Sequence, residues 1–284
     1  MPRITVAVIS PLCRIADVKG NLAHFEAWIR KATQRGAEFV AFPEMALCGY
    51  GHDYRIVEAA QTIPGPAVRT LERIAREEKV YLSVGMLEKK GLKFYNAQVV
   101  VGPSGYLGHY RKRHPTLDEM KYLKISPGNR FPIFRIKGIR VGLNICADSR
   151  HNDTIDALAR RGAELIHNPH SNSLGLGKDA EEWTRGKVVY YMDRVLRSRA
   201  HILVNNMAGS VSEGDGRRLH FSSGAMVLDP LGQVVTRTAQ KDRKEKMVLA
   251  TIDTDLRRMI PAFEFRHYKM SKGGPIPKVV KKLL

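Results

Sequence analysis

Three short stretches of this chain each place one reactive side chain directly after a strand-like apolar run. The stretches are residues 42–44, 110–114 and 143–148. The side chains are a carboxylate, an ammonium and a thiol: Glu44, Lys112 and Cys146. A thiol beside a base and a fixed cation can attack an electrophilic carbon and stabilise the oxyanion that results. The three groups therefore predict a cysteine-dependent reaction at one catalytic centre.

Cys146 stands where the apolar run 141–145 meets the polar residues that follow it. A sharp strand-to-turn junction there can present the thiol and leave a backbone N–H free nearby. That N–H, which belongs to Ala147, can form half of an oxyanion hole. A lone cysteine is more often a buried structural residue. Cys13 and Cys48 are interpreted in that way.

Glu44 follows Pro43 at the end of an apolar strand. Partial desolvation at such a position raises the pKa of a carboxyl group and makes it a usable general base near neutral pH. Lys112 can stabilise a developing oxyanion through its ammonium. Because 47 of the 284 residues are Lys or Arg, only its neighbours distinguish Lys112 from the other basic residues.

The elements that must position these groups alternate between strand and helix periodicity. Strands are predicted at about 3–10, 37–42, 80–87, 95–102, 106–111, 132–137, 139–145, 164–168, 202–206, 224–228, 233–238 and 247–253. Helices are predicted at about 21–35, 66–79, 153–162 and 179–200. The pattern β-α-β-α-β-β occurs twice, without a linker rich in Pro, Gly or Ser. We therefore predict an α/β or α+β domain of two pseudo-equivalent halves over residues 1–260.

The composition suits a globular enzyme. The chain is 43% hydrophobic, enough for a full core. No apolar run approaches the roughly 18 to 20 residues of a membrane span. Residues 1–9 read as a first strand rather than as a signal peptide. Three cysteines in a chain of this length favour reduced thiols, so we expect a cytoplasmic protein.

The formal charge of +19 raises the question of a nucleic-acid partner. The basic residues are spread along the whole chain, however, and alternate with acidic ones at residues 69–79. No RNA-binding motif with interleaved aromatics, zinc-finger spacing or basic tail is present. We therefore expect no nucleic-acid function, although an anionic substrate would be drawn toward the protein.

The order Glu, Lys, Cys and the residues around each resemble the nitrilase, or carbon–nitrogen hydrolase, superfamily. Around the lysine the similar residues are Asn96, Gly105, Tyr110, Arg111 and His114. Further similar segments are residues 45–50, 163–169, 205–209 and 221–232. The resemblance covers about residues 3 to 255, and agreement of several ordered blocks is far more specific than one motif.

The resemblance implies a four-layer α-β-β-α sandwich and a reaction. Glu44 would be the general base, Cys146 the nucleophile that forms a thioester, and Lys112 the oxyanion stabiliser, with His114 as a supporting residue. No cofactor is implied. Residues 261–284 would form a C-terminal arm at a subunit interface, so the resemblance also implies a homo-oligomer.

A second glutamate often assists in this family, between the lysine and a Pro-Gly pair, which here is Pro127-Gly128. Glu119 is the only Glu in that interval. Its distance to Gly128 departs from the common spacing, at which this chain has Lys121. Asp118 is adjacent. The resemblance therefore implies Glu119 as the assisting residue, with this departure.

The residues after the nucleophile help to separate the branches of the family. True nitrilases usually carry Trp-Glu there, whereas Ala147-Asp148 is closer to amidases and N-carbamoyl hydrolases. Arg150 can clamp a substrate carboxylate or form a salt bridge within the fold. His170 and Asn172 are candidate pocket residues by position. Residues 151–153 depart from the common amidase pattern, so no substrate is named.

The predicted function is therefore hydrolysis of a small amide or N-carbamoyl compound that releases ammonia or an amine. A true nitrilase is one alternative, and a basic, non-catalytic binding protein on the same fold is another. No His, Asp or Glu set has a familiar metal-ligand spacing, so no metal is expected. Residues 175–178 lack the features of a phosphate-binding loop.

Overall fold

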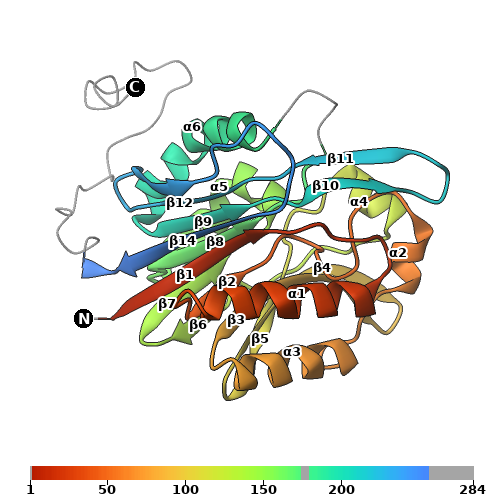
Figure 1. Ribbon diagram of the computed structural model, residues 1–284, viewed down its shortest axis with the longest axis horizontal. Coiled ribbons are helices and arrows are strands. Elements are labelled where there is room, and N and C mark those ends of the chain that lie inside the picture. The colour runs from red at the N-terminus through yellow and green to blue at the C-terminus, as the bar shows by residue number, and fades with distance from the viewer. Residues whose placement is uncertain (1, 174–178, 256–284) are drawn as a thin grey trace.

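Two six-stranded sheets lie face to face in the computed structural model, which describes residues 2–173 and 179–255 (Figure 1). The predicted arm at residues 261–284 lies outside the described residues. The first sheet has the order β14-β1-β2-β3-β4-β5. Its strands are β1 (Arg3–Ser10), β2 (Phe39–Ala41), β3 (Tyr81–Lys90), β4 (Lys93–Gly102), β5 (Gly105–Arg111) and β14 (Lys246–Asp253).

The second sheet has the order β13-β12-β9-β8-β7-β6. Its strands are β6 (Ile133–Ile136), β7 (Ile139–Leu143), β8 (Leu165–Pro169), β9 (His201–Asn205), β12 (Ala225–Leu228) and β13 (Val234–Arg237). Each sheet contains three neighbouring parallel strands, β1, β2 and β3 in one and β7, β8 and β9 in the other, with antiparallel strands on both sides. This correspondence gives the two halves their similarity. Strand β14 crosses from the second half and pairs with the whole of β1.

Helices cover the outer face of each sheet. On the first sheet these are α1 (Val18–Thr33) and α3 (Pro66–Glu77), and on the second α5 (Asn152–Arg160) and α6 (Ala180–Ser198). The buried side chains of α1 and α3 share one apolar cluster with the first sheet, and those of α5 and α6 pack on the second. The structure therefore has the layers α, β, β, α, which confirms the predicted sandwich.

The central strands bury both of their faces because successive side chains point in opposite directions. In β1, Val6 and Val8 belong to the apolar layer between the two sheets, whereas Ala7 and Ile9 pack beneath the helices. All four are fully buried. Burial on both faces explains why the strand reads as a nearly continuous apolar run.

Five short elements were not predicted. They are α2 (Tyr54–Glu58), α4 (Leu117–Tyr122), the hairpin of β10 (Ala208–Ser212) and β11 (Arg218–Ser222), and the 3-10 helix Cys146–Arg150. The hairpin is only partly buried and has little apolar alternation. The two α-helices are too short for a periodic pattern. Among the described residues, no helix combines the length and the apolarity required to cross a membrane.

Candidate active site

Three strand ends bring the predicted reactive groups together. Glu44 lies just beyond β2, and Lys112 directly follows β5. Strands β2 and β3 are parallel, and β4 is antiparallel to both β3 and β5. Strand β5 therefore runs in the same direction as β2, and both end at the same edge of the first sheet. Cys146 begins the 3-10 helix that follows β7 in the second sheet. The site therefore lies where carboxyl ends of strands from both sheets meet.

Lys112 is the centre of a buried ionic cluster. Its Nζ lies 2.6 Å from Glu44 Oε1 and 2.9 and 2.8 Å from the two oxygens of Glu119. Each of the three side chains is 1% exposed. The structure thus brings Glu119, the glutamate whose spacing departs from the family pattern, into direct contact with the lysine.

Asn96 and the N-terminus of α4 fix the two carboxylates. Asn96 Nδ2 donates to Glu44 Oε1 at 2.8 Å and to Glu119 Oε1 at 2.7 Å. Glu119 Oε2 also accepts from the backbone N–H of Thr116 at 2.7 Å, as part of a capping box. One residue therefore caps a helix and neutralises the buried ammonium.

The surroundings push the pKa values of the two carboxyl groups apart. Burial raises the pKa of Glu44, and the Glu119 charge raises it further, against the opposing effect of Lys112. Burial also opposes ionisation of Glu119, but the Lys112 charge and the bonds from Lys112, Thr116 and Asn96 hold its pKa below the ordinary value. Burial lowers the pKa of Lys112, yet the two glutamates raise it well above normal. The surroundings therefore favour the protonated form of Glu44 relative to an ordinary glutamate and the ionised form of Glu119.

Cys146 is held in a left-handed backbone conformation, with φ of +44°. This conformation is uncommon outside glycine, and such residues occur often at active sites. The residue is 9% exposed, and Ala147 beside it 5%. Burial raises the pKa of the Cys146 thiol to about 12; Glu44 also raises it, whereas Lys112 and Lys187 lower it. The thiol is therefore protonated in the resting protein and requires a base.

The Ala147 N–H lies in the first turn of the 3-10 helix Cys146–Arg150. Amides at the start of a helix have no acceptor within the helix, so they are suited to an anionic oxygen.

A chain of hydrogen bonds runs from Trp183 through Asn172 to the Cys146 sulfur. Asn172 Nδ2 donates to Cys146 Sγ at 3.5 Å, and Trp183 Nε1 donates to Asn172 Oδ1 at 3.3 Å. Asn206 holds the Asn172 backbone through two further bonds, of 2.7 and 3.1 Å. The amide of Asn172 is therefore oriented with its NH₂ group toward the thiol.

Asp148 ties the nucleophile segment to the lysine segment. Its Oδ2 accepts from the Tyr110 hydroxyl at 2.7 Å and from the Ile145 N–H at 3.1 Å. Its Oδ1 accepts from the His114 N–H at 2.7 Å. The Asp148 carboxylate thereby links the residues on both sides of Lys112 to the turn that presents Cys146.

The other predicted pocket residues occupy different surroundings. His170 is buried, and its Nε2 pairs with the Tyr191 hydroxyl at 2.6 Å. Burial keeps the pKa of His170 well below normal, and the Lys187, Lys112 and Arg150 charges lower it further. It is therefore a neutral side chain packed edge-on against Tyr191. Arg150 is exposed, and among the described residues it has no ion-pair partner, so the salt bridge within the fold is not observed.

Three residues near the site were not identified as site residues from the sequence. Burial raises the pKa of Tyr50 well above normal, and the charges of Glu119, Glu44, Lys112 and Cys146 also act on it. Lys187 lies over the rings of Trp183 and Tyr190, at 5.3 and 5.1 Å. Tyr50 belongs to a segment used for the resemblance. Trp183 and Lys187 lie on α6, whose polar and apolar residues give no signal for a site.

Cys13 and Cys48 are both buried in the apolar cluster of the first sheet. Burial raises the pKa of Cys13 well above its ordinary value and that of Cys48 to about 12. Their positions are those of structural residues.

One group of three possible metal ligands occurs among the described residues, although the sequence spacing predicted none. The ligand atoms of His114, His151 and Asp153 lie within 4.8 Å of one another. His114 Nε2 is 3.0 Å from Asp153 Oδ1, and the two imidazole rings stack at 3.7 Å.

Comparison with known proteins identifies relatives over nearly the whole chain. A family model described as Carbon-nitrogen hydrolase matches residues 3–261. The chain is 30% identical to a protein named Nitrilase from Pyrococcus abyssi, over 88% of this chain and 90% of that protein. It is 31% identical to an omega-amidase from Homo sapiens, over 88% and 91%. An (R)-stereoselective amidase from a Pseudomonas species is 31% identical over 76% and 74%.

Solved structures share the architecture. A carbon–nitrogen hydrolase from Helicobacter pylori superposes with a TM-score of 0.77 at 19% identity, covering 90% of this chain and 92% of that one. An amidase of the nitrilase superfamily from Nesterenkonia gives 0.75 at 19% identity, over 90% and 93%. Both likenesses concern the fold.

Proposed function

The chain belongs to the carbon–nitrogen hydrolase family, and from this premise we propose that it cleaves small amides or N-carbamoyl compounds through a thioester on Cys146. That it is a hydrolase acting on C–N bonds follows from the family. The observation that carries the finer proposal is the buried cluster in which Lys112 contacts two glutamates with divergent pKa values beside a strained cysteine.

The proposed reaction begins with Glu44, which takes the proton of the Cys146 thiol as the sulfur attacks the carbonyl carbon. The Lys112 ammonium and the Ala147 N–H stabilise the oxyanion. As the C–N bond breaks, Glu44 returns the proton to the leaving nitrogen, and ammonia or an amine departs. A thioester remains on Cys146.

In the second half, Glu44 takes a proton from water, and the resulting hydroxide attacks the thioester carbon. The C–S bond breaks, the acid product leaves, and the proton held by Glu44 restores the thiol. Glu119 remains ionised throughout and keeps the buried Lys112 charged. The cycle balances without a cofactor.

One feature supports an amide substrate, and a second supports an anionic group on that substrate. Two of the relatives described above are named amidases, although the one from Pyrococcus abyssi is named Nitrilase. The charges of Lys187 and Arg150 act on buried His170, and that of Lys187 also acts on Cys146, so both cations lie near the site. Such cations favour a carboxylate on the part of the substrate that is not cleaved.

The proposal is tested by ammonia release from short amides, amides carrying a carboxylate, carbamoyl amino acids, carbamoyl diamines and nitriles. Wild type is assayed beside Cys146→Ala, with Cys48→Ala, a substitution of a second buried cysteine, as a matched control. We expect turnover of an amide or carbamoyl compound, about 10³-fold or more lower in Cys146→Ala and retained in Cys48→Ala. Trapping of an acyl group on Cys146 by mass spectrometry would identify the thioester.

Each alternative has its own outcome. Turnover of nitriles alone would show that the substrate is a nitrile rather than an amide, and would leave the cysteine mechanism in place. Undiminished turnover in a folded Cys146→Ala protein would exclude the cysteine mechanism.

A further inference from the structure

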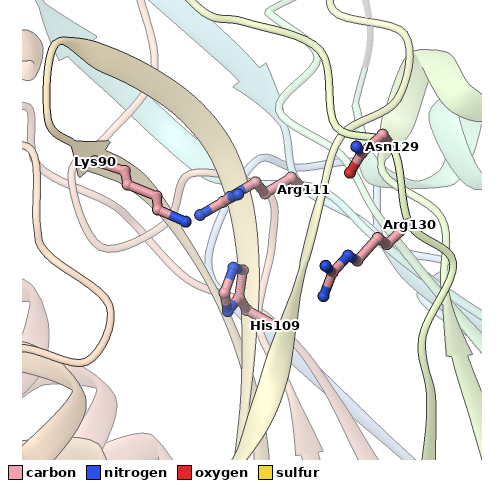
Figure 2. Close-up of a pocket in the computed structure, with 5 residues that line it drawn as sticks. All are labelled: Lys90, His109, Arg111, Asn129 and Arg130. Carbon is pink, nitrogen blue, oxygen red and sulfur yellow. The ribbon is translucent and has the colours of Figure 1, made fainter.

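A cavity of about 360 Å³ opens on the first sheet, and its lining includes no member of the cluster around Lys112 (Figure 2). Its lining residues are Lys90, His109, Arg111, Asn129 and Arg130. In Figure 2 the side chains of Lys90, Arg111 and Arg130 extend toward a common space from different segments. A volume of this size lies in the range of small-molecule sites. Every lining side chain carries a hydrogen-bond donor, and none is acidic.

Arg111 is held rigidly at the centre of this cavity. Its Nε and one terminal nitrogen donate to the two oxygens of Glu88, at 2.6 and 2.5 Å, and its guanidinium stacks on the Tyr95 ring at 4.1 Å. The register shows how it reaches Glu88 from β5: the residue opposite Arg111 on β4 is Ala97, whose small side chain lets the arginine cross that strand. A guanidinium fixed in advance loses little entropy when it binds an anion.

The charges around the cavity do not balance. Glu88, which is 1% exposed, offsets one positive charge among Lys90, Arg111 and Arg130 and leaves two. Lys90 and Arg130 have no ion-pair partner among the described residues. His109 adds no charge near neutral pH, because burial lowers its pKa and the Arg111, Lys90 and Arg130 charges lower it further, against the opposing effect of Glu88.

We propose that this cavity binds the dianionic phosphate group of a small phosphate monoester. A monoester carries close to two negative charges at pH 7 and three acceptor oxygens, which match the two uncompensated cations and the additional donors. The other terminal nitrogen of Arg111, Nη1, is not used by Glu88, so it can donate to the phosphate. The remaining volume accommodates the organic part of the ligand. The site takes a ligand different from the amide substrate.

The cavity lies behind the catalytic lysine. Side chains alternate along β5, so Arg111 and His109 share the face of the sheet opposite that of Tyr110 and Lys112. The segment that supplies Asn129 and Arg130 begins at Gly128, whose N–H donates to the Lys112 carbonyl at 2.7 Å. A side chain at Gly128 would meet the Arg111 carbonyl at 2.2 Å. A bound phosphate would therefore contact both segments that hold the Lys112 backbone.

The test is isothermal titration of the full chain with inorganic phosphate and glycerol phosphate, in chloride at matched ionic strength. The binding variant is Lys90→Ala/Arg130→Ala. The control is Lys89→Ala/Arg135→Ala, which removes the same two positive charges. Lys89 is next to Lys90 in the chain, Arg135 follows shortly after Arg130, and both are exposed and do not line the cavity. We expect saturable binding to wild type and control, weakened about tenfold or more in the binding variant.

Two results would overturn the proposal. Equal binding by the two double variants, or no saturable binding to wild type, would show that the cavity takes no phosphate. Displacement of phosphate by a single-stranded oligonucleotide that binds more tightly than glycerol phosphate, and loses that affinity in the binding variant, would reassign the cavity to a nucleic-acid backbone.

Discussion

At the residue scale, one lysine gives two glutamates different roles. Lys112 and Asn96 contact both carboxylates, but Glu119 has an additional donor, the Thr116 N–H, that favours its charged form. Since the Glu119 charge helps to raise the pKa of Glu44, replacing Glu119 by a neutral isostere has a predictable sign. Glu119→Gln removes the repulsion and leaves Lys112 to favour the Glu44 carboxylate.

We therefore predict that the acid limb of the pH profile of kcat/KM reports Glu44. Activity requires the carboxylate, so kcat/KM rises with pH, and the midpoint lies above the ordinary glutamate pKa because the pKa of Glu44 is raised. In Glu119→Gln the midpoint moves to lower pH, at a reduced maximum. Glu44→Gln loses activity at every pH. An acid limb that stays in place in Glu119→Gln would contradict the coupling.

At the element scale, strand β3 supports the turn that carries Glu44. A Cβ at Gly85 would lie 2.4 Å from both Met45 N and Pro43 O, and the Gly85 carbonyl already accepts from the Leu47 N–H at 2.9 Å. Only a glycine lets the strand approach this closely. We predict that Gly85→Ala displaces the turn and lowers kcat/KM by about 10²-fold or more, because small misplacements of a catalytic group are costly.

Gly186→Ala is the matched control for this change. Nothing lies within 4 Å of a Cβ at Gly186, which is inside α6. Alanine favours a helix interior by about 1 kcal/mol over glycine, so we expect unchanged activity and a slightly higher melting temperature. Steady-state kinetics and thermal unfolding of both variants check the pair. Full activity in Gly85→Ala would exclude the supporting role of β3.

At the scale of the whole molecule, the sequence predicted what depends on periodicity and on local motifs. The periodicity predicts an α/β or α+β domain, and residues such as Val6 and Ala7 show its alternation directly. The four-layer sandwich is implied by the family resemblance. Glu119 is the single glutamate of its interval, and the structure shows it as part of a capping box with Thr116 and in contact with Lys112. Contacts made only by folding, such as Trp183 to Asn172 or Arg111 across Ala97, have no signal in the linear sequence.

The two sheets are also joined by a buried polar network that crosses the apolar layer. His167 Nδ1 lies 3.0 Å from Ser83 Oγ on the first sheet, and its Nε2 lies 3.1 Å from Asn205 Oδ1. Asn205 Nδ2 donates to the carbonyls of Ile9 and Ala41, at 2.7 and 3.0 Å. Asn205 Oδ1 can only accept, so His167 carries a proton on Nε2. Because burial lowers the pKa of His167 to about 4, its Nδ1 is unprotonated near neutral pH and accepts from Ser83. The network therefore uses the neutral imidazole.

Burial lowers the pKa of His167 from 6.5 to about 4, so protonation favours the unfolded chain. The stabilisation is complete above pH 6.5 and is lost as the pH falls toward 4, since the unfolded state binds more protons in that interval. The loss amounts to about 3 kcal/mol at pH 4, from about 1.36 kcal/mol per pKa unit.

We predict that His167→Gln reduces the decline in the free energy of unfolding between pH 6.5 and 4 by about this amount. The exposed His151→Gln keeps the wild-type decline. Urea unfolding at a series of pH values measures both, and NMR titration of His167 in the folded wild type gives its midpoint directly. A midpoint near 6.5, or an unchanged decline in folded His167→Gln, would contradict the neutral network.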